Sequence, residues 1–383
     1  MFAKHACLFV LVAVLTALAG TGPARAQATT STPPPVLSAV DLGPIQQNSH
    51  VLFRDGLFSG DFEGTSIWTF GDTDLNAPNS QGTDWDDNSL AYTTDLDGSK
   101  GLSLPGNAPE TSAGVPDQYL PFTQAEETFN QEHAGSGSSC EVKPCGEAYA
   151  LWNGPVVADP ADNRVLFFYY ELRRISGQPG WTTIGEGIAT WSPGGSVIRP
   201  IESPGSQFPT LMWGPNGPDW ADGAVTVGAT LYAYGCSSGF LVQNCDLGRV
   251  PLADATEAAD WSYYTSSGTW SPDVTQAATV IQGGAAGTSV FWAPFLDEYM
   301  AIYMPPESNE VVDRVAPEPW GPWSPSSDIT ATEPPAAGDV DYAGMAHPEF
   351  AQDDGRIQYV AYYQPTGSWS GDDRWLQVTF AAP

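Results

Sequence analysis

Short apolar runs separated by turn residues recur along most of this chain. Residues 165–170 read VLFFYY and residues 299–303 read YMAIY, and Gly, Pro, Asn and Asp gather between such runs. Runs of this length, rich in Val, Ile and aromatic residues, are typical of β-strands. No ten-residue segment has convincing helical periodicity. The predicted strands cover residues 66–70, 165–170, 226–234, 289–292, 299–303, 357–363 and 375–380.

A loose repeat is visible within this pattern. An aromatic-rich strand pair is followed by a loop and then by a segment that carries tryptophan, as at Trp261, Trp270 and Trp320. Units of several dozen residues made of four short strands are typical of propeller blades. At roughly 40 to 50 residues per blade, residues 51–380 have room for about five blades. We therefore predict an all-β fold with a single five-bladed β-propeller, and a β-sandwich is the alternative.

Composition supports the all-β prediction. The chain has 40 Gly, 34 Pro and 14 Trp, and the Lys-Glu patterning that favours helices is missing. Residues 81–148 form the largest irregular stretch, which we interpret as a long insertion near the first blade. Long loops on a rigid scaffold often carry binding functions.

The N-terminus has the features of a secretory signal. Lys4 and His5 precede an apolar run over residues 6–19, and Ala24-Arg25-Ala26 fits a cleavage site. We expect a protein secreted to the extracellular space or the periplasm. The predicted organisation is a signal peptide over 1–26, a disordered Pro/Thr/Ser-rich leader over 27–44 and one domain over 45–383.

Four cysteines follow the predicted signal peptide, as two close pairs. The pairs are Cys140 with Cys145 and Cys236 with Cys245. Export permits disulfides, and we expect two local ones. A zinc site is the weaker alternative, because neither pair has C-x-x-C spacing or a neighbouring histidine.

The chain is strongly acidic. Its net charge is −32, and removal of Lys4 and Arg25 with the signal peptide makes it −34. This charge argues against nucleic acid, an anionic membrane surface or a polyanionic substrate as partner, and favours a neutral or cationic ligand. It also keeps a secreted protein soluble. We expect a monomer that binds a neutral polysaccharide.

Two aspartates beside glycines are the most informative candidates for chemistry. Asp55-Gly56 and Gly71-Asp72 lie at the ends of short apolar runs, with one turn between them. Glycosidic-bond cleavage needs one carboxyl to protonate the leaving oxygen and another to attack or to activate water. Asp-Gly and Gly-Asp are also ordinary turn residues, so the local pattern alone favours a turn.

An acidic cluster lies in the long insertion. Oxygen-rich loops can bind calcium, but the spacing does not match an EF-hand. A solvated loop is the favoured interpretation; no cofactor is expected, with calcium as the open exception. The cluster comprises Asp84, Asp86, Asp87, Asn88, Asp95 and Asp97.

Short motifs in a fixed order make the chain resemble a known family. These are secreted five-bladed propeller proteins, long described as a domain of unknown function, that include bacterial endo-D-arabinanases. The similarity runs with gaps from about residue 51 to the end. The motifs are Arg54-Asp55-Gly56, Trp68-Thr69-Phe70-Gly71-Asp72-Thr73, Asn88-Ser89-Leu90-Ala91, Trp213-Gly214-Pro215, Trp261-Ser262-Tyr263-Tyr264, Arg314-Val315-Ala316, Gly321-Pro322-Trp323-Ser324 and His347-Pro348-Glu349.

The resemblance implies hydrolysis within D-arabinan of mycobacterial-type cell walls, a furanose-containing polysaccharide. It also implies that Asp55 and Asp72 are the catalytic pair. The loop between Cys236 and Cys245 and the insertion over 81–148 depart from the commonest form of the family, and either could reshape the substrate site.

Several other residues are candidates for substrate binding. Arg54 could keep Asp55 ionised or form a structural salt bridge. Asp74 is expected on the same face as Asp72. Trp213 is the tryptophan that we expect to stack on a sugar. The remaining candidates are Asn88, Glu186, His347 and Glu349, for each of which a structural role is the alternative.

Two other functions fit parts of the pattern. A noncatalytic carbohydrate-binding propeller would keep the aromatic platforms without the carboxyl pair. A sialidase-type glycosidase is suggested by Ser267-Gly268-Thr269-Trp270, which matches part of the Asp-box motif but lacks its aspartate. The acidic chain argues against an anionic sugar.

Overall fold

The structure is a computed structural model that describes residues 31–382, except 136–137, 176–179, 238, 240 and 368–369. The signal peptide predicted over 1–26 lies outside the described residues. Within them the protein is all-β, with strands in six sheets and a single α-helix. No helix among the described residues has the length and apolar character needed to cross a membrane.

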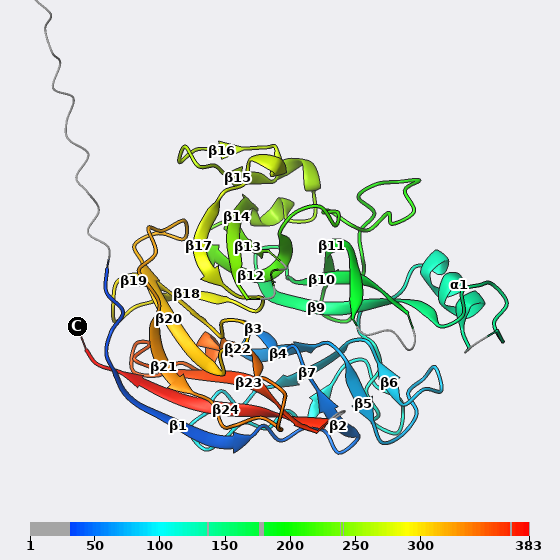
Figure 1. Ribbon diagram of the computed structural model, residues 1–383, viewed down its shortest axis with the longest axis horizontal. Helices are drawn as coiled ribbons and strands as arrows, with labels where there is room; N and C mark the ends of the chain where they lie inside the picture. The colour runs from blue at the N-terminus through cyan, green and yellow to red at the C-terminus, as the bar shows by residue number, and fades with distance from the viewer. Residues whose placement is uncertain are drawn as a thin grey trace, which may run out of the picture.

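The strands follow one another along the chain in nearly sheet-by-sheet order (Figure 1). The first sheet joins β3 (Phe58–Phe62), β4 (Thr65–Phe70), β7 (Ser89–Thr93) and β8 (Gly106–Asn107). A small sheet beside it joins β2 (Val51–Arg54), β5 (Thr73–Leu75) and β6 (Trp85–Asp86). The next joins β9 (Glu147–Asp159), β10 (Arg164–Ile175) and β11 (Trp181–Trp191).

Three further sheets complete the fold. One joins β12 (Asp219–Val227), β13 (Thr230–Cys236), β14 (Gln243–Pro251), β15 (Ser262–Tyr264), β16 (Trp270–Ser271) and β17 (Thr279–Gly284). The next joins β18 (Ser289–Ala293), β19 (Glu298–Tyr303), β20 (Glu310–Ala316) and β21 (Ser327–Ala331). The last joins β22 (Tyr342–Ala346), β23 (Ile357–Gly367), β24 (Ser370–Phe380) and β1 (Val36–Pro44).

Five of these sheets contribute to one small central cavity of about 70 Å³. Each provides residues at or beside one edge strand, here called its first strand. These strands are β3, β9, β12, β18 and β22. The lining segments are 57–59, 155–156, 223–224, 288–290 and 345–348. The first strands of five sheets therefore meet around a common centre.

Packing of sheet against sheet explains why the apolar runs do not alternate strictly with polar residues. Five of the six residues of β4 are buried, and β10 is buried over most of its length. Strands covered on both faces become continuously apolar. Large aromatic residues fill the space between sheets, including the fully buried Trp68, Trp220, Trp261 and Trp375.

The first strand pairs with the last. β1 runs antiparallel to β24, from Val36 opposite Phe380 to Pro44 opposite Arg374, and Figure 1 shows the two side by side. The prediction of a disordered leader up to residue 44 is therefore wrong for residues 36–44. Pairing with β24 satisfies the backbone groups of a segment that has no pairing partner in its own stretch of sequence.

Two other predictions of local structure need correction. The run over residues 226–234 is a hairpin of β12 and β13, in which Val227 pairs with Thr230 across a two-residue turn. Its turn contains Gly228 at φ +59°, a conformation that glycine adopts readily.

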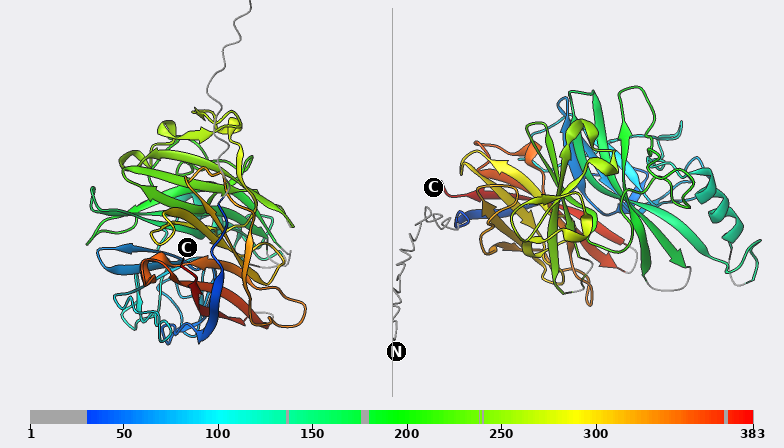
Figure 2. Two further views of the ribbon diagram at one scale, coloured as in Figure 1. Left: turned by 90° about the vertical axis from the view of Figure 1, so that its left-hand side faces the viewer. Right: turned by 90° about the horizontal axis from the view of Figure 1, so that it is seen from above.

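The long insertion contains one helix, α1 (Gln124–His133), where none was expected. Thr123 and Glu126 form a capping box at its start, a signal that the sequence does carry. Arg199 bonds to the buried Glu126 at 2.6 Å, so the helix is anchored by an ion pair rather than by an apolar face. Figure 2 shows α1 projecting at the end of the molecule opposite β19–β21. The described part of the chain also contains four short 3-10 helices, over Leu252–Asp254, Ala258–Asp260, Val274–Gln276 and Pro348–Phe350.

Candidate active site

Asp55 lies in a tight turn between β2 and β3. The next residue, Gly56, has φ +97°, and a Cβ there would collide with the side-chain amide of Asn153. A Cβ on Gly71 would lie 3.0 Å from the Asp55 Oδ1 atom. Gly71 N also donates to the backbone oxygen of Asp55 at 2.8 Å. The two glycines thus let the turn, the carboxyl and β9 approach one another closely.

The carboxyl of Asp55 is half-buried and electrostatically strained. Burial raises its pKa to about 7, and the neighbouring charge of Asp72 acts in the same direction. The Tyr342 hydroxyl, which donates to Oδ2 at 2.7 Å, and the cation of Arg174 act against this rise. Asp55 can therefore hold a proton close to neutral pH.

Asp72 follows β4 and precedes β5, and it has a cation beside it. Both Trp152 Nε1, at 2.9 Å, and Arg174 Nη2 donate to the same oxygen, Oδ1. Burial raises the pKa of Asp72, whereas the charge and hydrogen bond of Arg174 and the hydrogen bond of Trp152 lower it. The two aspartates thus have different surroundings, although one residue, Gly71, touches both.

Asp87 is a third carboxyl in this group. Its Oδ1 lies 3.3 Å from Arg174 Nη1. Burial raises its pKa to about 7; Arg174 lowers the pKa and Asp72 raises it. One arginine therefore bridges two carboxyls, and the charges of Asp72 and Arg174 both act on Asp55. Closely placed carboxyls of this kind share protons near neutral pH.

Two tryptophans extend the site from the sheet of β9, β10 and β11. The rings of Trp152 and Trp181 meet edge to face, with centroids 4.6 Å apart. The Arg174 guanidinium lies 5.0 Å from the centre of the Trp152 ring. Trp181 is the cross-strand partner of Arg174 and is 58% exposed.

Sequence reasoning brought Asp55 and Asp72 together but missed their partners. Tyr342 is 287 residues away from Asp55 along the chain, and no local pattern links them. Arg174 carried a usable signal, because the chain has only 13 Lys and Arg against 45 Asp and Glu. A cation at a strand end in so acidic a chain is a candidate partner for a carboxyl pair.

Arg54 does not lie in the site. It is 1% exposed, its guanidinium lies 3.7 Å from the centre of the Phe70 ring, and it donates to Asn107 at 3.3 Å and to Gln47. Burial lowers its pKa to about 9, against the charge of the buried Asp373. Strand alternation turns Arg54 into the core behind Asp55, so the prediction that it binds substrate is wrong.

Asp74 and Asn88 lie near the pair without joining it. Asp74 is in β5, where burial and the charge of Asp84 raise its pKa, and no contact with Asp55 or Asp72 is found among the described residues. Asn88 is buried and accepts from the backbone of Tyr119 and Leu120. Its side-chain oxygen ties residues 119–120 to the start of β7, so Asn88 has a structural role.

Trp213 is buried in the core, not exposed on a loop. It is 6% exposed, packs against Trp220 and Trp261, and donates to the Tyr263 hydroxyl at 2.7 Å. The Gly-Pro-rich sequence after Trp213 indicated a surface turn, but Trp213 itself forms a backbone bridge with Glu186. The prediction that Trp213 stacks on a sugar is therefore wrong.

Glu186 belongs to a second, buried group of carboxyls. It is 1% exposed, and burial raises its pKa to about 9, with the charges of Asp219 and Asp222 acting in the same direction. Asp222 is bonded to the Tyr170 hydroxyl and accepts from Cys236 N at 3.0 Å. Glu186 is enclosed by protein groups and is not available to a ligand at the surface.

His347 lines the central cavity, and both His347 and Glu349 contact the first sheet. His347 stacks on Trp68 with ring centres 4.1 Å apart, and burial lowers its pKa to about 3. Its Nδ1 lies 2.6 Å from the Ser59 hydroxyl. Glu349 accepts from the same hydroxyl at 2.5 Å and from Ser66 at 2.7 Å. These groups tie the last sheet to the first.

Both expected cysteine pairs form disulfides, Cys140–Cys145 and Cys236–Cys245. The second joins β13 to β14 at a directly opposed pair. In the acidic cluster, Asp86 accepts from Asn79 at 2.6 Å and Asp87 contacts Arg174. Within the described ranges no group of three His, Cys, Asp or Glu is arranged to hold a metal ion.

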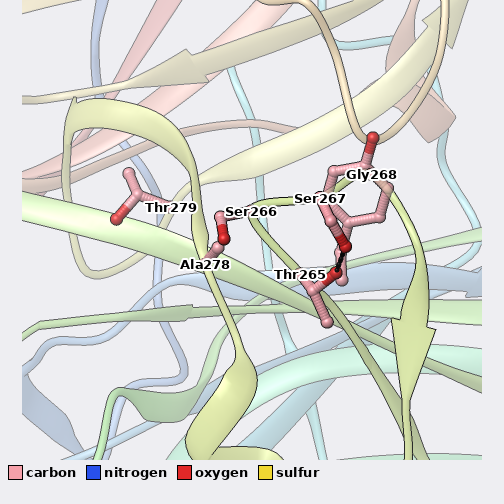
Figure 3. Close-up of a pocket in the computed structure, with 7 residues that line it drawn as sticks. Thr265, Ser266, Ser267, Gly268, Ala278 and Thr279 are labelled. Carbon is pink, nitrogen blue, oxygen red and sulfur yellow. Dashed lines mark hydrogen bonds between the residues drawn. The ribbon is translucent and has the colours of Figure 1, made fainter. Parts of the chain in front are cut away.

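A second cavity, of about 350 Å³, lies away from these carboxyls, at the hairpin of β15 and β16 (Figure 3). It is lined mostly by hydroxyl-bearing residues of the loop over 264–268 and by Ala278 and Thr279. Ser267 and Gly268, from the partial Asp-box match, lie in this loop. Its hydroxyls bond to one another, as Thr265 does to Ser267 at 2.9 Å, so the match marks a tight turn.

The fold is similar to that of solved structures from two bacteria. A Bacteroides ovatus protein described as a candidate hydrolase matches with a TM-score of 0.57, 15% identity and coverage of 86% of each chain. A family 117 glycoside hydrolase from Zobellia galactanivorans matches with a TM-score of 0.51 and 10% identity, over 89% of this chain and 90% of that chain. The likeness concerns the fold, which is of the propeller type found in glycoside hydrolases.

No curated protein matches the sequence. A protein family described as "Domain of unknown function (DUF4185)" matches residues 155–366. This region includes Arg174, Trp181 and Tyr342, and it starts after Asp55 and Asp72. Since the match spans more than half of the chain, the protein belongs to the DUF4185 family.

Proposed function

We propose that the protein is a secreted glycoside hydrolase that cleaves within a furanose-containing polysaccharide, with Asp55 and Asp72 as the catalytic carboxyls. One observation carries this proposal. Two carboxyls lie in neighbouring turns, where the charge of Asp72 raises the pKa of Asp55, and Asp72 is the one bonded to an arginine. Glycosidases need a pair of carboxyls whose surroundings push their pKa values apart.

The proposed scaffold is a five-bladed β-propeller. Five sheets contribute their first strands to one central cavity, and β1 completes the last sheet by pairing with β24. The small sheet of β2, β5 and β6 carries the turns of Asp55 and Asp72 at the edge of the first blade. The shared cavity and the completion of the last sheet by β1 support this architecture.

The surroundings favour Asp55 as the acid and Asp72 as the base or nucleophile. Asp55 holds its proton to about pH 7, so it can give that proton to the leaving oxygen as the bond from the anomeric carbon breaks. Arg174 and Trp152 stabilise the ionised form of Asp72 through Oδ1. Its other oxygen, Oδ2, is the one that would attack the anomeric carbon or take a proton from the attacking water.

We infer that the substrate is a neutral furanoside, with D-arabinan the leading candidate. The charge of −32 and the carboxyls of the site disfavour an anionic sugar. The motifs around Asp55 and Asp72 resemble those of endo-D-arabinanases, and this resemblance supports the choice of polymer.

Product release from mycobacterial arabinogalactan tests the proposal. Wild type should release oligosaccharides, and Asp55→Asn and Asp72→Asn should each lower the rate by about 10²- to 10⁴-fold. Asp74→Asn is the matched control, because it removes a carboxyl two residues from Asp72 that is outside the cluster; its rate should stay within about 2-fold, the range of a surface change. No release by a folded wild-type protein, extended to other furanosides, would exclude the proposal.

A substrate with a good leaving group separates the two roles. An aryl arabinofuranoside needs little help from an acid, so Asp55→Asn should retain far more activity on it than on the polymer. Asp72→Asn should remain inactive on both substrates. The reverse result would exchange the assignments and leave the pair intact.

A noncatalytic carbohydrate-binding function is the second candidate. The exposed Trp181 favours it, because an aromatic ring at the surface can bind sugar without any hydrolysis. Binding of polysaccharide by wild type with no product, and equal binding by Asp55→Asn, would support this function over the first.

A further inference from the structure

We propose that Trp181 and Trp152 form a stacking subsite that binds the apolar face of a neutral sugar ring next to Asp72. This inference rests on the proposed function, and it adds a binding position and a substrate selectivity to it.

The two rings are held at a fixed angle. Two contacts hold Trp152 in place. Its Nε1 donates to Asp72 at 2.9 Å, and the Arg174 guanidinium lies 5.0 Å from the centre of its ring. Trp181 meets Trp152 with an interplanar angle of 67° and centroids 4.6 Å apart. Its cross-strand partner is Arg174. A preorganised ring loses little side-chain freedom when a ligand binds.

The exposure of Trp181 sets it apart from the other tryptophans. At 58% it is more exposed than Trp292, at 42%, whereas Trp68, Trp220 and Trp261 are buried in the core. Exposing so much indole is unfavourable in a free protein, since burial of apolar surface stabilises by about 25 cal/mol per Å². A ligand that covers the ring would recover this free energy.

The groups beside Trp181 identify the class of ligand. Arg174, Asp72 and Asp87 are polar, and they lie along the same stretch of surface as the tryptophan pair. A sugar has one face of C–H groups, which suits an aromatic ring, and a rim of hydroxyls, which suits carboxylates. An apolar protein partner would bury the carboxylate charge in excess of Arg174 without offering a hydrogen-bond donor to it, which is costly.

The charge balance selects a neutral sugar. Arg174 contacts both Asp72 and Asp87, so its positive charge is already matched by two carboxyls. Asp55 adds a third carboxyl nearby. A uronic or sialic acid carboxylate would therefore face net negative charge, whereas an uncharged pentose or hexose ring would not.

Binding to an inactive variant tests the subsite separately from catalysis. In the Asp55→Asn background, binding of arabino-oligosaccharides is measured by calorimetry, with and without Trp181→Ala. Loss of one stacking contact should weaken binding by about 5- to 10-fold. Trp181→Tyr should restore most of the affinity, because it keeps an aromatic face. Trp292→Ala, a change of another exposed tryptophan, should have no effect.

The outcomes distinguish the subsite from the proposed function. Equal binding with and without Trp181, or no binding of any neutral oligosaccharide, would overturn the subsite. Tighter binding of oligogalacturonides than of neutral chains would also overturn it. Loss of binding in Trp181→Ala together with a wild type that releases no product would keep the subsite and overturn the hydrolase.

Discussion

This protein contains two groups of carboxyls, and the two groups differ in their partners. The group of Asp55, Asp72 and Asp87 is partly exposed and surrounds Arg174. The group of Glu186, Asp219 and Asp222 has no arginine or lysine bonded to it within the described residues; it is instead bonded to the Tyr170 hydroxyl and to backbone N–H groups.

Under the proposed function, the difference separates a site for chemistry from a structural network. A buried carboxyl without a cation stays protonated and behaves as a neutral hydrogen-bonding group. A carboxyl beside an arginine can stay ionised while its neighbour holds a proton, and acid–base chemistry needs both states at once. Raised pKa values alone therefore do not identify the site, because they occur in both groups.

Among the variants that test this comparison, a substitution of Arg174 should have the largest effect on activity. Replacing it in Arg174→Gln should lower kcat/KM by about 10²-fold, the lower range for loss of a group that stabilises charge. Because Arg174 lowers the pKa of Asp55, Asp72 and Asp87, both limbs of the pH–rate profile should move to higher pH. The pH dependence of kcat/KM measures both changes.

The adjacent arginine provides the control for this variant. Arg173 pairs with Glu147 at 2.5 Å, on the other face of β10, so Arg173→Gln should leave the profile in place. A profile that is unmoved in Arg174→Gln would mean that Arg174 does not set the proton balance of the site.

A smaller effect is expected from Gly71→Ala. The new Cβ would lie 3.0 Å from the Asp55 carboxyl and should displace it, lowering kcat by about 10-fold or more. Gly214→Ala is the control, because a Cβ at Gly214 meets no atom within 4 Å. Equal kcat values in the two variants would show that the reaction tolerates a displacement of the Asp55 carboxyl.

Tyr342→Phe should have a modest effect. It removes the hydrogen bond that lowers the pKa of Asp55, so the alkaline limb of the pH–rate profile should shift upward. The rate at the optimum should change by less than about 10-fold, the factor that corresponds to one ordinary hydrogen bond. A shift to lower pH would contradict the assignment of Asp55 as the acid.

Glu186→Gln should change activity least, by less than about 2-fold, as for a change remote from the site. Its effect should appear in stability. An unfolded glutamate ionises at about pH 4.3, whereas burial keeps folded Glu186 protonated up to about pH 9. The contribution of Glu186 to the stability of the folded protein is therefore fully present below about pH 4.3, and it is lost as the pH rises towards 9.

Melting temperatures between pH 5 and pH 9 measure this contribution. The wild type should lose on the order of 2–4 °C for each kcal/mol involved, and Glu186→Gln should flatten the curve. A catalytic loss in Glu186→Gln would instead assign the second group to the reaction and break the comparison.

Local chemistry in the sequence was enough to predict the all-β class, most of the strands and both disulfides. The two turns at Asp55 and Asp72 were also predictable, because Asp-Gly and Gly-Asp mark strand ends. Arg54 shows where this reasoning stops. Its neighbour Asp55 reaches the site while Arg54 enters the core, and only the pairing register of β2 decides which residue faces which way.

Contacts between distant segments could not be predicted. Tyr342 reaches Asp55 from the last sheet, and Trp181 reaches Trp152 across β10. Trp213 was expected at the surface because turn residues follow it, yet core packing against Trp220 and Trp261 determines its position. The helix α1 was missed because its sequence is polar and it depends on an ion pair with Arg199.

The pairing of β1 with β24 has a consequence for synthesis of the protein. Residues 36–44 leave the ribosome well before their partner strand, residues 370–380, is made. The edge of β1 therefore stays unpaired while the intervening sheets fold, and exposed strand edges promote association between chains. A cell that makes this protein must keep the early strand from incorrect pairing until β24 has been made.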